Sequence, residues 1–118
     1  MQNIIIGNHA EQKAYDFLTK QGLKNLTRNY RCRMGEIDLI MKEGANLIFI
    51  EVRFRKSSDY GQSFETVTRS KQQRIIKASL HFLKKYPKFQ RANCRFDVIG
   101  VDFKGKITWI KNAFTVQY

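Results

Sequence analysis

The chain has 118 residues, 42% of them apolar, with 22 Lys and Arg against ten Asp and Glu and a net charge of +12. The length predicts one domain covering residues 1–118, and the apolar content excludes a disordered basic tail. No apolar run approaches the roughly 18–20 residues of a membrane-spanning helix, and no signal peptide is apparent, so we expect no membrane association.

The excess of positive charge is typical of proteins that bind nucleic acid. Cys32 and Cys94 are too few for a disulfide framework, and no Cys-x-x-Cys pair is present for zinc. His9 and His81 lack ligand spacing. We therefore expect a cytoplasmic protein with reduced thiols.

The first helix is predicted from about Asn8 to Gln21, ended by Gly22. Glu11 falls on the same helical face as Leu18, which would turn its carboxylate toward the sheet. Alternatively, Asn8 caps the helix and Glu11 bonds back to it as in a capping box. Both readings stay open.

A strand around Leu26 to Arg31 is followed by a predicted β-hairpin, Gly35 to Ile40 and Ile48 to Arg53, around a turn at residues 43–46. If Lys42 pairs with Leu47, Asp38 falls opposite Glu51. Strand alternation then places the side chains of Asp38, Glu51 and Arg53 on one side of the hairpin. The apolar residues expected on the other side are Ile37, Leu39, Ile48, Ile50 and Val52.

Two carboxylates facing each other across a ladder repel at ordinary pH. A divalent cation bound between Asp38 and Glu51 is the simplest compensation. The alternative is a solvated sheet face with scattered charges, which the spacing alone does not exclude.

A loop from Ser57 to Ser63 precedes a second predicted helix, from about Ser70 to Lys85. The stretch from Thr66 to Phe96 contains no acid, and its basic side chains gather on one helical face, which favours phosphate contact over an ordinary solvated face. That face carries Lys71, Arg74, Lys77, His81, Lys84 and Lys85.

Gln72 is the exception on this helix, because it falls on the core-facing side. A buried amide needs hydrogen-bond partners. It either caps a backbone group or holds a water or metal-bound group near the acids. Strands from Cys94 to Asp102 and from Ile107 to Lys111 complete an α/β or α+β order, a sheet flanked by helices.

Several motifs occur in order along the chain. They are G-x-x-A-E-x-x-A-x-x-F-L from Gly7, R-N-Y-R-C-R-x-G-E-I-D-L-I from Arg28, F-I-E-V-R-x-R from Phe49, V-T-x-x-K-Q from Val67 and R-F-D-V from Arg95. This ordered set resembles the small YraN-like bacterial family. Its G-E-I-D and E-V-R-x-R elements resemble the core of PD-D/E-x-K nucleases of the Holliday-junction resolvase type. The resemblance implies a restriction-endonuclease-like core with a mixed central sheet.

The resemblance also implies roles for individual residues. Asp38 and Glu51 would bind Mg²⁺ or Mn²⁺, and Glu11 would complete the metal site. Gln72 matches a helical Gln near the core of related nucleases. Arg53 stands where the motif usually has Lys, and because Arg stays protonated it could stabilise phosphate charge but hardly act as a base.

We therefore expect a metal-dependent nuclease acting on DNA, branched or otherwise structured, with a homodimer left open. The alternatives are a non-catalytic nucleic-acid-binding protein that keeps the fold, and a scaffold whose basic face meets an acidic protein. The residues expected to contact nucleic acid are Arg53, Arg55, Lys56, Arg69, Lys71, Arg74, Lys77 and Lys84.

Overall fold

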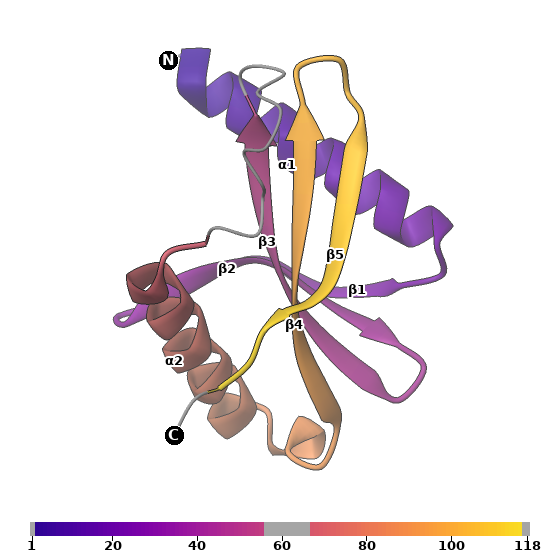
Figure 1. Cartoon of the computed structure of the whole chain (residues 1–118). Coiled ribbons are helices and arrows are strands. Elements are labelled where there is room, and N and C mark those ends of the chain that lie inside the picture. Colours follow the sequence, from indigo (N-terminus) through magenta and orange to yellow (C-terminus); the bar gives the residue numbers. More distant parts are fainter. Residues whose placement is uncertain (1, 56–66, 117–118) are drawn as a thin grey trace.

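The computed structural model describes residues 2–55 and 67–116, which form a five-stranded sheet with strand order β1-β2-β3-β4-β5. Figure 1 shows α1 and α2 on opposite sides of this sheet, with β1 and β2 running steeply across the direction of β3, β4 and β5. The expected α+β class with a mixed central sheet flanked by helices is confirmed, and it is compatible with a restriction-endonuclease-like core.

The described elements follow the expected order. They are α1 (Gln2–Lys20), β1 (Lys24–Cys32), β2 (Gly35–Glu43), β3 (Asn46–Arg55), α2 (Arg69–Lys85), a short 3₁₀ turn (Pro87–Phe89), β4 (Asn93–Asp102) and β5 (Ile107–Phe114). The expected start of the first helix at Asn8 is wrong, since α1 begins at Gln2. The loop expected from Ser57 to Ser63 lies outside the described residues, as does Lys56. None of the helices described is long and apolar enough to cross a bilayer.

The predicted hairpin register is confirmed. Lys42 pairs with Leu47, and the antiparallel ladder between β2 and β3 continues to the pair Leu39 and Ile50. The turn is tight, and Gly44 adopts a positive φ of 59°, a conformation that glycine reaches without a steric penalty. After β3 the chain returns through α2, so that β4 pairs with β3 in parallel.

Both faces of the sheet are covered, and each face has its own core. The face toward α1 buries Leu39, Met41, Ile48, Ile50 and Ile99 against Ala10, Ala14 and Leu18. The face toward α2 buries Ile40, Leu47, Phe49 and Val98 against Ile75, Ala78 and Phe82. Ile37 was expected on the side of Leu39, but it packs into the α2 core with Tyr30. The strong rotation of β2 across β3 accounts for this change of face.

The position of α2 follows from a cap and an amphipathic pattern. The Thr68 hydroxyl oxygen accepts a hydrogen bond from the Lys71 backbone N–H at 3.2 Å, which satisfies one free donor of the first turn. Ile75 and Phe82 are buried under the helix, whereas Arg74 and Lys77 are exposed. The cap and the packing of α2 on the sheet therefore place the first turn of this helix beside the point where the pairing of β2 with β3 ends.

Candidate metal and nucleic-acid site

Four acids line one cavity of about 330 Å³, and Glu36, near the start of β2, is the exposed one. Glu11 comes from α1, Asp38 from β2 and Glu51 from β3. The cavity lies where the paired part of β2 and β3 ends, so that side chains from both helices reach the opening. We call this the acid cavity.

Asp38 enters the acid cavity because the β2–β3 ladder stops one residue before it. The Asp38 Oδ2 atom accepts a hydrogen bond from the backbone N–H of Val52 at 2.8 Å, which anchors the carboxyl group against β3. The carboxyl group of Glu51 lies close enough to that of Asp38 to disfavour its ionised form. The two acids that the register placed opposite each other are thus in contact.

Two carboxyl groups that face each other at short range repel when both are ionised, so the pair favours the state in which one of them holds a proton. Burial, and next the facing carboxyl of Glu51, raise the pKa of Asp38 to about 8. Both causes disfavour the ionised form. The Val52 N–H and the nearby Lys71 charge act in the opposite direction but do not balance them. Without a bound cation, the pair is therefore protonated at neutral pH.

Glu11 is half-buried, as expected from the helical face that it shares with Leu18. Its Oε1 atom accepts hydrogen bonds from Asn29 Nδ2 at 3.0 Å and from Arg28 Nη2 at 3.5 Å. The capping-box alternative is wrong, because α1 extends to Gln2 and Asn8 lies within the helix. Burial and the charge of Asp38 raise the pKa of Glu11. This carboxylate therefore belongs to the acid cavity but is held by β1.

Lys71 supplies a cation to the acid pair. Its Nζ atom lies 3.5 Å from Glu51 Oε1, and the lysine side chain is 48% exposed whereas that of Glu51 is 9% exposed. The amine thus stands at the mouth of the acid cavity with its charge directed inward. Sequence reasoning placed Lys71 only on the basic face of the helix. The contact with Glu51 was missed.

Gln72 and Arg53 are not among the residues that line the acid cavity. Gln72 Nε2 donates to the Val67 carbonyl at 2.8 Å, so the structure favours the backbone-capping alternative for this amide. Arg53 follows Glu51 by two positions on β3 and is half-buried. Alternation in the strand places Arg53 on the side of Glu51, facing α2.

The fold and this cavity can be compared with known proteins. A profile described as "Uncharacterised protein family UPF0102" matches residues 10–101. A UPF0102 protein from Coxiella burnetii is 49% identical over 113 residues, which are 96% of this chain and 94% of the relative. Another, from Saccharophagus degradans, is 51% identical over 111 residues, covering 94% and 93%. The chain belongs to the UPF0102 family. This confirms the YraN-like resemblance.

The UPF0102 match includes Glu11, Asp38, Glu51 and Lys71. A third relative, from Legionella pneumophila, is 50% identical over 109 residues, 92% of each chain. The names of these relatives state no activity. The chemistry of the UPF0102 site must therefore be argued from its geometry.

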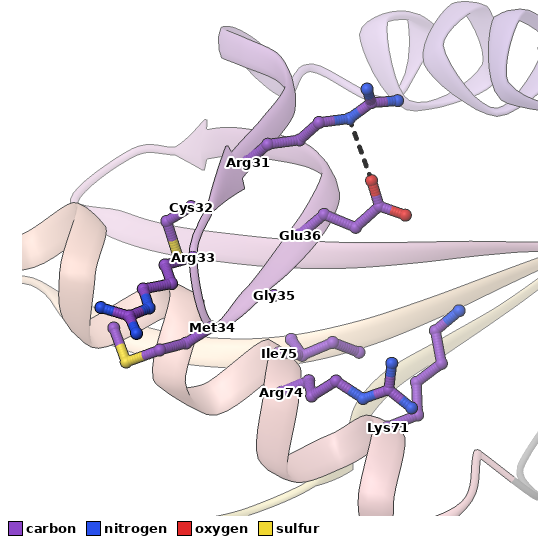
Figure 2. A pocket seen from close by; sticks show the side chains of 9 residues that line it. All are labelled: Arg31, Cys32, Arg33, Met34, Gly35, Glu36, Lys71, Arg74 and Ile75. Carbon is purple, nitrogen blue, oxygen red and sulfur yellow. Dashed lines mark hydrogen bonds and ion pairs between the residues drawn. The ribbon is translucent and has the colours of Figure 1, made fainter.

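A second cavity, also of about 330 Å³, adjoins the acid cavity in this UPF0102 protein. It lies between the turn joining β1 and β2 and the first turns of α2, as Figure 2 shows. We call it the basic pocket, because its lining includes Arg31, Arg33, Lys71 and Arg74 with Glu36 as the one acid. Arg31, Glu36 and Lys71 also line the acid cavity. The two cavities therefore share a wall.

The other cations expected to bind nucleic acid lie elsewhere. Arg69, Lys77 and Lys84 are exposed on α2 outside the linings of both cavities. Arg55 ends β3, and Lys56 is outside the described residues. Of the predicted set, the structure thus brings only Lys71 and Arg74 to the described cavities.

The acid cavity offers two converging metal ligands. Asp38 and Glu51 provide carboxylate oxygens, the donor type that Mg²⁺ and Mn²⁺ prefer, and a divalent cation would relieve the repulsion that a shared proton now relieves. Over residues 2–55 and 67–116, no three His, Cys, Asp or Glu side chains form a ready-made metal site. Glu11 would have to leave Asn29 and Arg28 to become a third ligand.

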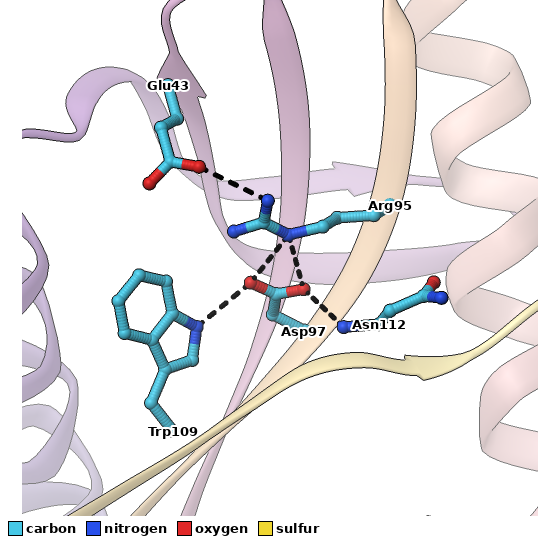
Figure 3. A network of polar contacts seen from close by, with 5 residues as sticks. All are labelled: Glu43, Arg95, Asp97, Trp109 and Asn112. Carbon is cyan, nitrogen blue, oxygen red and sulfur yellow. Dashed lines mark hydrogen bonds and ion pairs between the residues drawn. The ribbon is translucent and has the colours of Figure 1, made fainter.

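A second buried aspartate has very different surroundings. Asp97 on β4 accepts hydrogen bonds from Arg95 Nε at 3.0 and 3.2 Å, from Trp109 Nε1 at 2.9 Å and from the Asn112 backbone N–H at 2.9 Å, as Figure 3 shows. Arg95 Nη1 also donates to Glu43 at 3.2 Å. Every oxygen of the Asp97 carboxylate therefore has a donor. The R-F-D-V motif accordingly encodes a structural network between β4 and β5.

Proposed function

We propose that this UPF0102 protein is a divalent-metal-dependent phosphodiesterase that acts on DNA, branched or otherwise structured. The observation that carries the proposal is the contact between Asp38 and Glu51 in a cavity flanked by Lys71, within a protein of net charge +12. Acids brought together without full compensation inside a cationic protein favour a cation site over a structural role.

Hydrolysis of a phosphodiester needs an attacking water and relief of the negative charge at phosphorus. Asp38 and Glu51 are the residues that would hold Mg²⁺ or Mn²⁺, and Glu11 is a further half-buried acid of the same cavity. The bound metal would lower the pKa of a coordinated water and neutralise charge on the phosphate oxygens. The remaining chemistry must come from side chains of this protein.

In the resembled nucleases a single lysine follows the glutamate on the strand. In this protein Lys71 and Arg53 would share the role of that lysine. Lys71 Nζ, which ion-pairs with Glu51, would donate hydrogen bonds to the reacting phosphate at the mouth of the acid cavity. Arg53 is always protonated and would stabilise phosphate charge without accepting a proton. The substitution of Arg for the motif's Lys is therefore compatible with hydrolysis.

A non-catalytic nucleic-acid-binding protein is the second candidate. The observation that favours it is the engagement of Glu11 by Asn29 and Arg28, which leaves two converging acids in the described cavity. In this case the acids would set the position of the cations and no bond would be cleaved. Both candidates predict binding to DNA, and only the first predicts metal-dependent cleavage.

The test is cleavage of a labelled four-way junction, compared with linear duplex and single strands, in Mg²⁺ and in Mn²⁺. We expect Glu51→Gln to abolish cleavage, because it removes a charged ligand. We expect Arg53→Lys to retain or increase cleavage, because a cation is kept and a group with a tunable pKa is gained.

The matched control is Asp16→Asn, which neutralises an exposed acid of α1 and should leave cleavage unchanged. Absence of cleavage in both the wild type and Arg53→Lys, with both metals, would favour the binding protein. Cleavage that survives in Glu51→Gln would place the active site elsewhere or reveal a contaminating nuclease.

A further inference from the structure

The basic pocket has a wall that depends on a single glycine. A Cβ atom on Gly35 would lie 2.5 Å from the backbone carbonyl oxygen of Arg74, closer than side chains approach backbone atoms. Only glycine therefore lets the β1–β2 turn pack directly on α2. Both elements contribute an arginine to the pocket, and Figure 2 shows Arg33 extending beside Met34 and Arg74 extending the other way, toward Lys71.

The four cations of the basic pocket differ in how they are compensated. Arg31 Nε pairs with Glu36 Oε2 at 3.1 Å, and Lys71 pairs with Glu51. Within residues 2–55 and 67–116, Arg33 and Arg74 make neither an ion pair nor a hydrogen bond through their side chains. Two exposed guanidinium groups of the pocket's lining are therefore paired with no acid of the described residues.

We infer that the basic pocket is a subsite for the backbone of the nucleic acid, in which Arg33 and Arg74 each hold a phosphate. Guanidinium groups bind phosphate oxygens through paired, charge-assisted hydrogen bonds. The shared wall of Arg31, Glu36 and Lys71 joins this pocket to the acid cavity. A strand that has one phosphate on Arg33 and another on Arg74 would continue toward Lys71 and the acid pair.

This inference rests on the proposed function for the identity of the ligand. It adds the path of the strand, from the basic pocket to the acid cavity. It also assigns a role to the β1–β2 turn, whose Arg33 was absent from the residues expected to bind nucleic acid. The turn and α2 together hold the strand, whereas the rest of the basic face of α2 supplies longer-range attraction.

The experiment measures the binding of fluorescent duplex DNA by anisotropy in EDTA, over a series of salt concentrations. The variant is Arg33→Gln with Arg74→Gln. We expect at least tenfold weaker binding at low salt and a slope of log K against log salt that is smaller in magnitude by about 2, since two phosphate contacts are lost.

The matched control is Lys104→Gln with Lys106→Gln, which removes the same charge from the β4–β5 turn. Figure 1 shows this turn far from α2, and both lysines are exposed. The control should lose less than about threefold in affinity. Equal losses in the two double variants would overturn the inference, because net charge alone would explain them.

A conservative double variant distinguishes the contribution of arginine's paired hydrogen bonds from that of its charge. Arg33→Lys with Arg74→Lys should keep the salt slope but bind DNA more weakly than the wild type, because lysine cannot form the paired hydrogen bonds. Loss of binding to phosphatidylserine vesicles, with DNA binding kept in the glutamine variant, would overturn the inference in favour of a lipid headgroup. Competition by inorganic phosphate alone, without loss of DNA affinity in that variant, would overturn it in favour of a free anion.

Failure of the subsite can be distinguished from failure of the proposed hydrolysis. Binding in EDTA does not depend on a metal or on cleavage. If the wild type cleaves DNA, the glutamine variant should raise KM while kcat changes little, because the two arginines contact phosphates that do not react. Weakened binding in a protein that never cleaves would leave the subsite intact and reject only the hydrolysis.

Discussion

Asp38 and Asp97 lie on the same sheet and have opposite surroundings. Asp97 is fully buried, and donors from Arg95, Trp109 and the Asn112 backbone satisfy its carboxylate. Asp38 receives one backbone hydrogen bond and faces a second carboxyl group, that of Glu51. A carboxylate that is paired on all sides stabilises the fold, whereas one that is left opposing another acid points to a ligand.

The largest effect is expected for Asp97→Asn. The amide would direct a donor toward groups that are themselves donors and would leave Arg95 with only Glu43 as its charged partner. Removing one member of a buried pair typically costs about 3–5 kcal/mol of stability. Urea unfolding should show a loss of this size, and Asp16→Asn should change the free energy of unfolding by less than about 0.5 kcal/mol. A loss of unfolding free energy below 1 kcal/mol for Asp97→Asn would contradict a structural role for Asp97 and remove its contrast with Asp38.

Asp38→Asn should have a smaller effect of the opposite sign. Because the folded-state pKa of Asp38 is raised to about 8, the metal-free wild type should lose stability as pH rises from about 4 to about 8, with no further loss from this group above that pH. The variant cannot ionise at this position and should lack that loss. Near pH 8.5 it should be more stable than the wild type by on the order of 1 kcal/mol.

Thermal unfolding from pH 5 to pH 9, without divalent metal, checks this expectation. The two proteins should differ least at pH 5, where the wild-type Asp38 is protonated. A variant that is less stable than the wild type at every pH would show that Asp38, like Asp97, is a structural acid.

Lys71→Gln should have the smallest effect on stability. The lysine of its ion pair with Glu51 is about half exposed, and such pairs contribute about 0–1 kcal/mol, in contrast to the pair of Arg95 with the fully buried Asp97. If the protein hydrolyses DNA, the same variant should lower kcat by about 100-fold, because a positioned donor at the reacting phosphate is lost. A variant with full activity would assign Lys71 to binding alone.

The sequence was sufficient for the features set by local geometry. Turn composition and alternation predicted the register that brings Asp38 to Glu51. Helical periodicity turned Glu11 toward the sheet. It did not predict the start of α1, because Gly7 and the β-branched residues before it have low helix propensity, a weak preference that the fold overrides.

Other features depended on packing between distant elements. Helical periodicity put Lys71 on the basic face and Gln72 on the core-facing side, but it did not show that Lys71 is the one that reaches Glu51, because that depends on how α2 lies on the sheet. That placement depends on the contact of Gly35 with Arg74. The change of face at Ile37 likewise results from the twist of β2 across β3, which a two-residue alternation cannot express.

The central claim is that Asp38 and Glu51 together bind a divalent cation, and calorimetric titration of Mn²⁺ tests it most directly. The wild type should bind saturably, more tightly as pH rises toward 8, with release of protons, because the cation displaces the proton shared by the pair. Asp38→Asn and Glu51→Gln should each bind at least tenfold more weakly, and Asp16→Asn should match the wild type. Equal Mn²⁺ affinity in the wild type and Asp38→Asn, or no saturable binding by the wild type at pH 8, would contradict the claim.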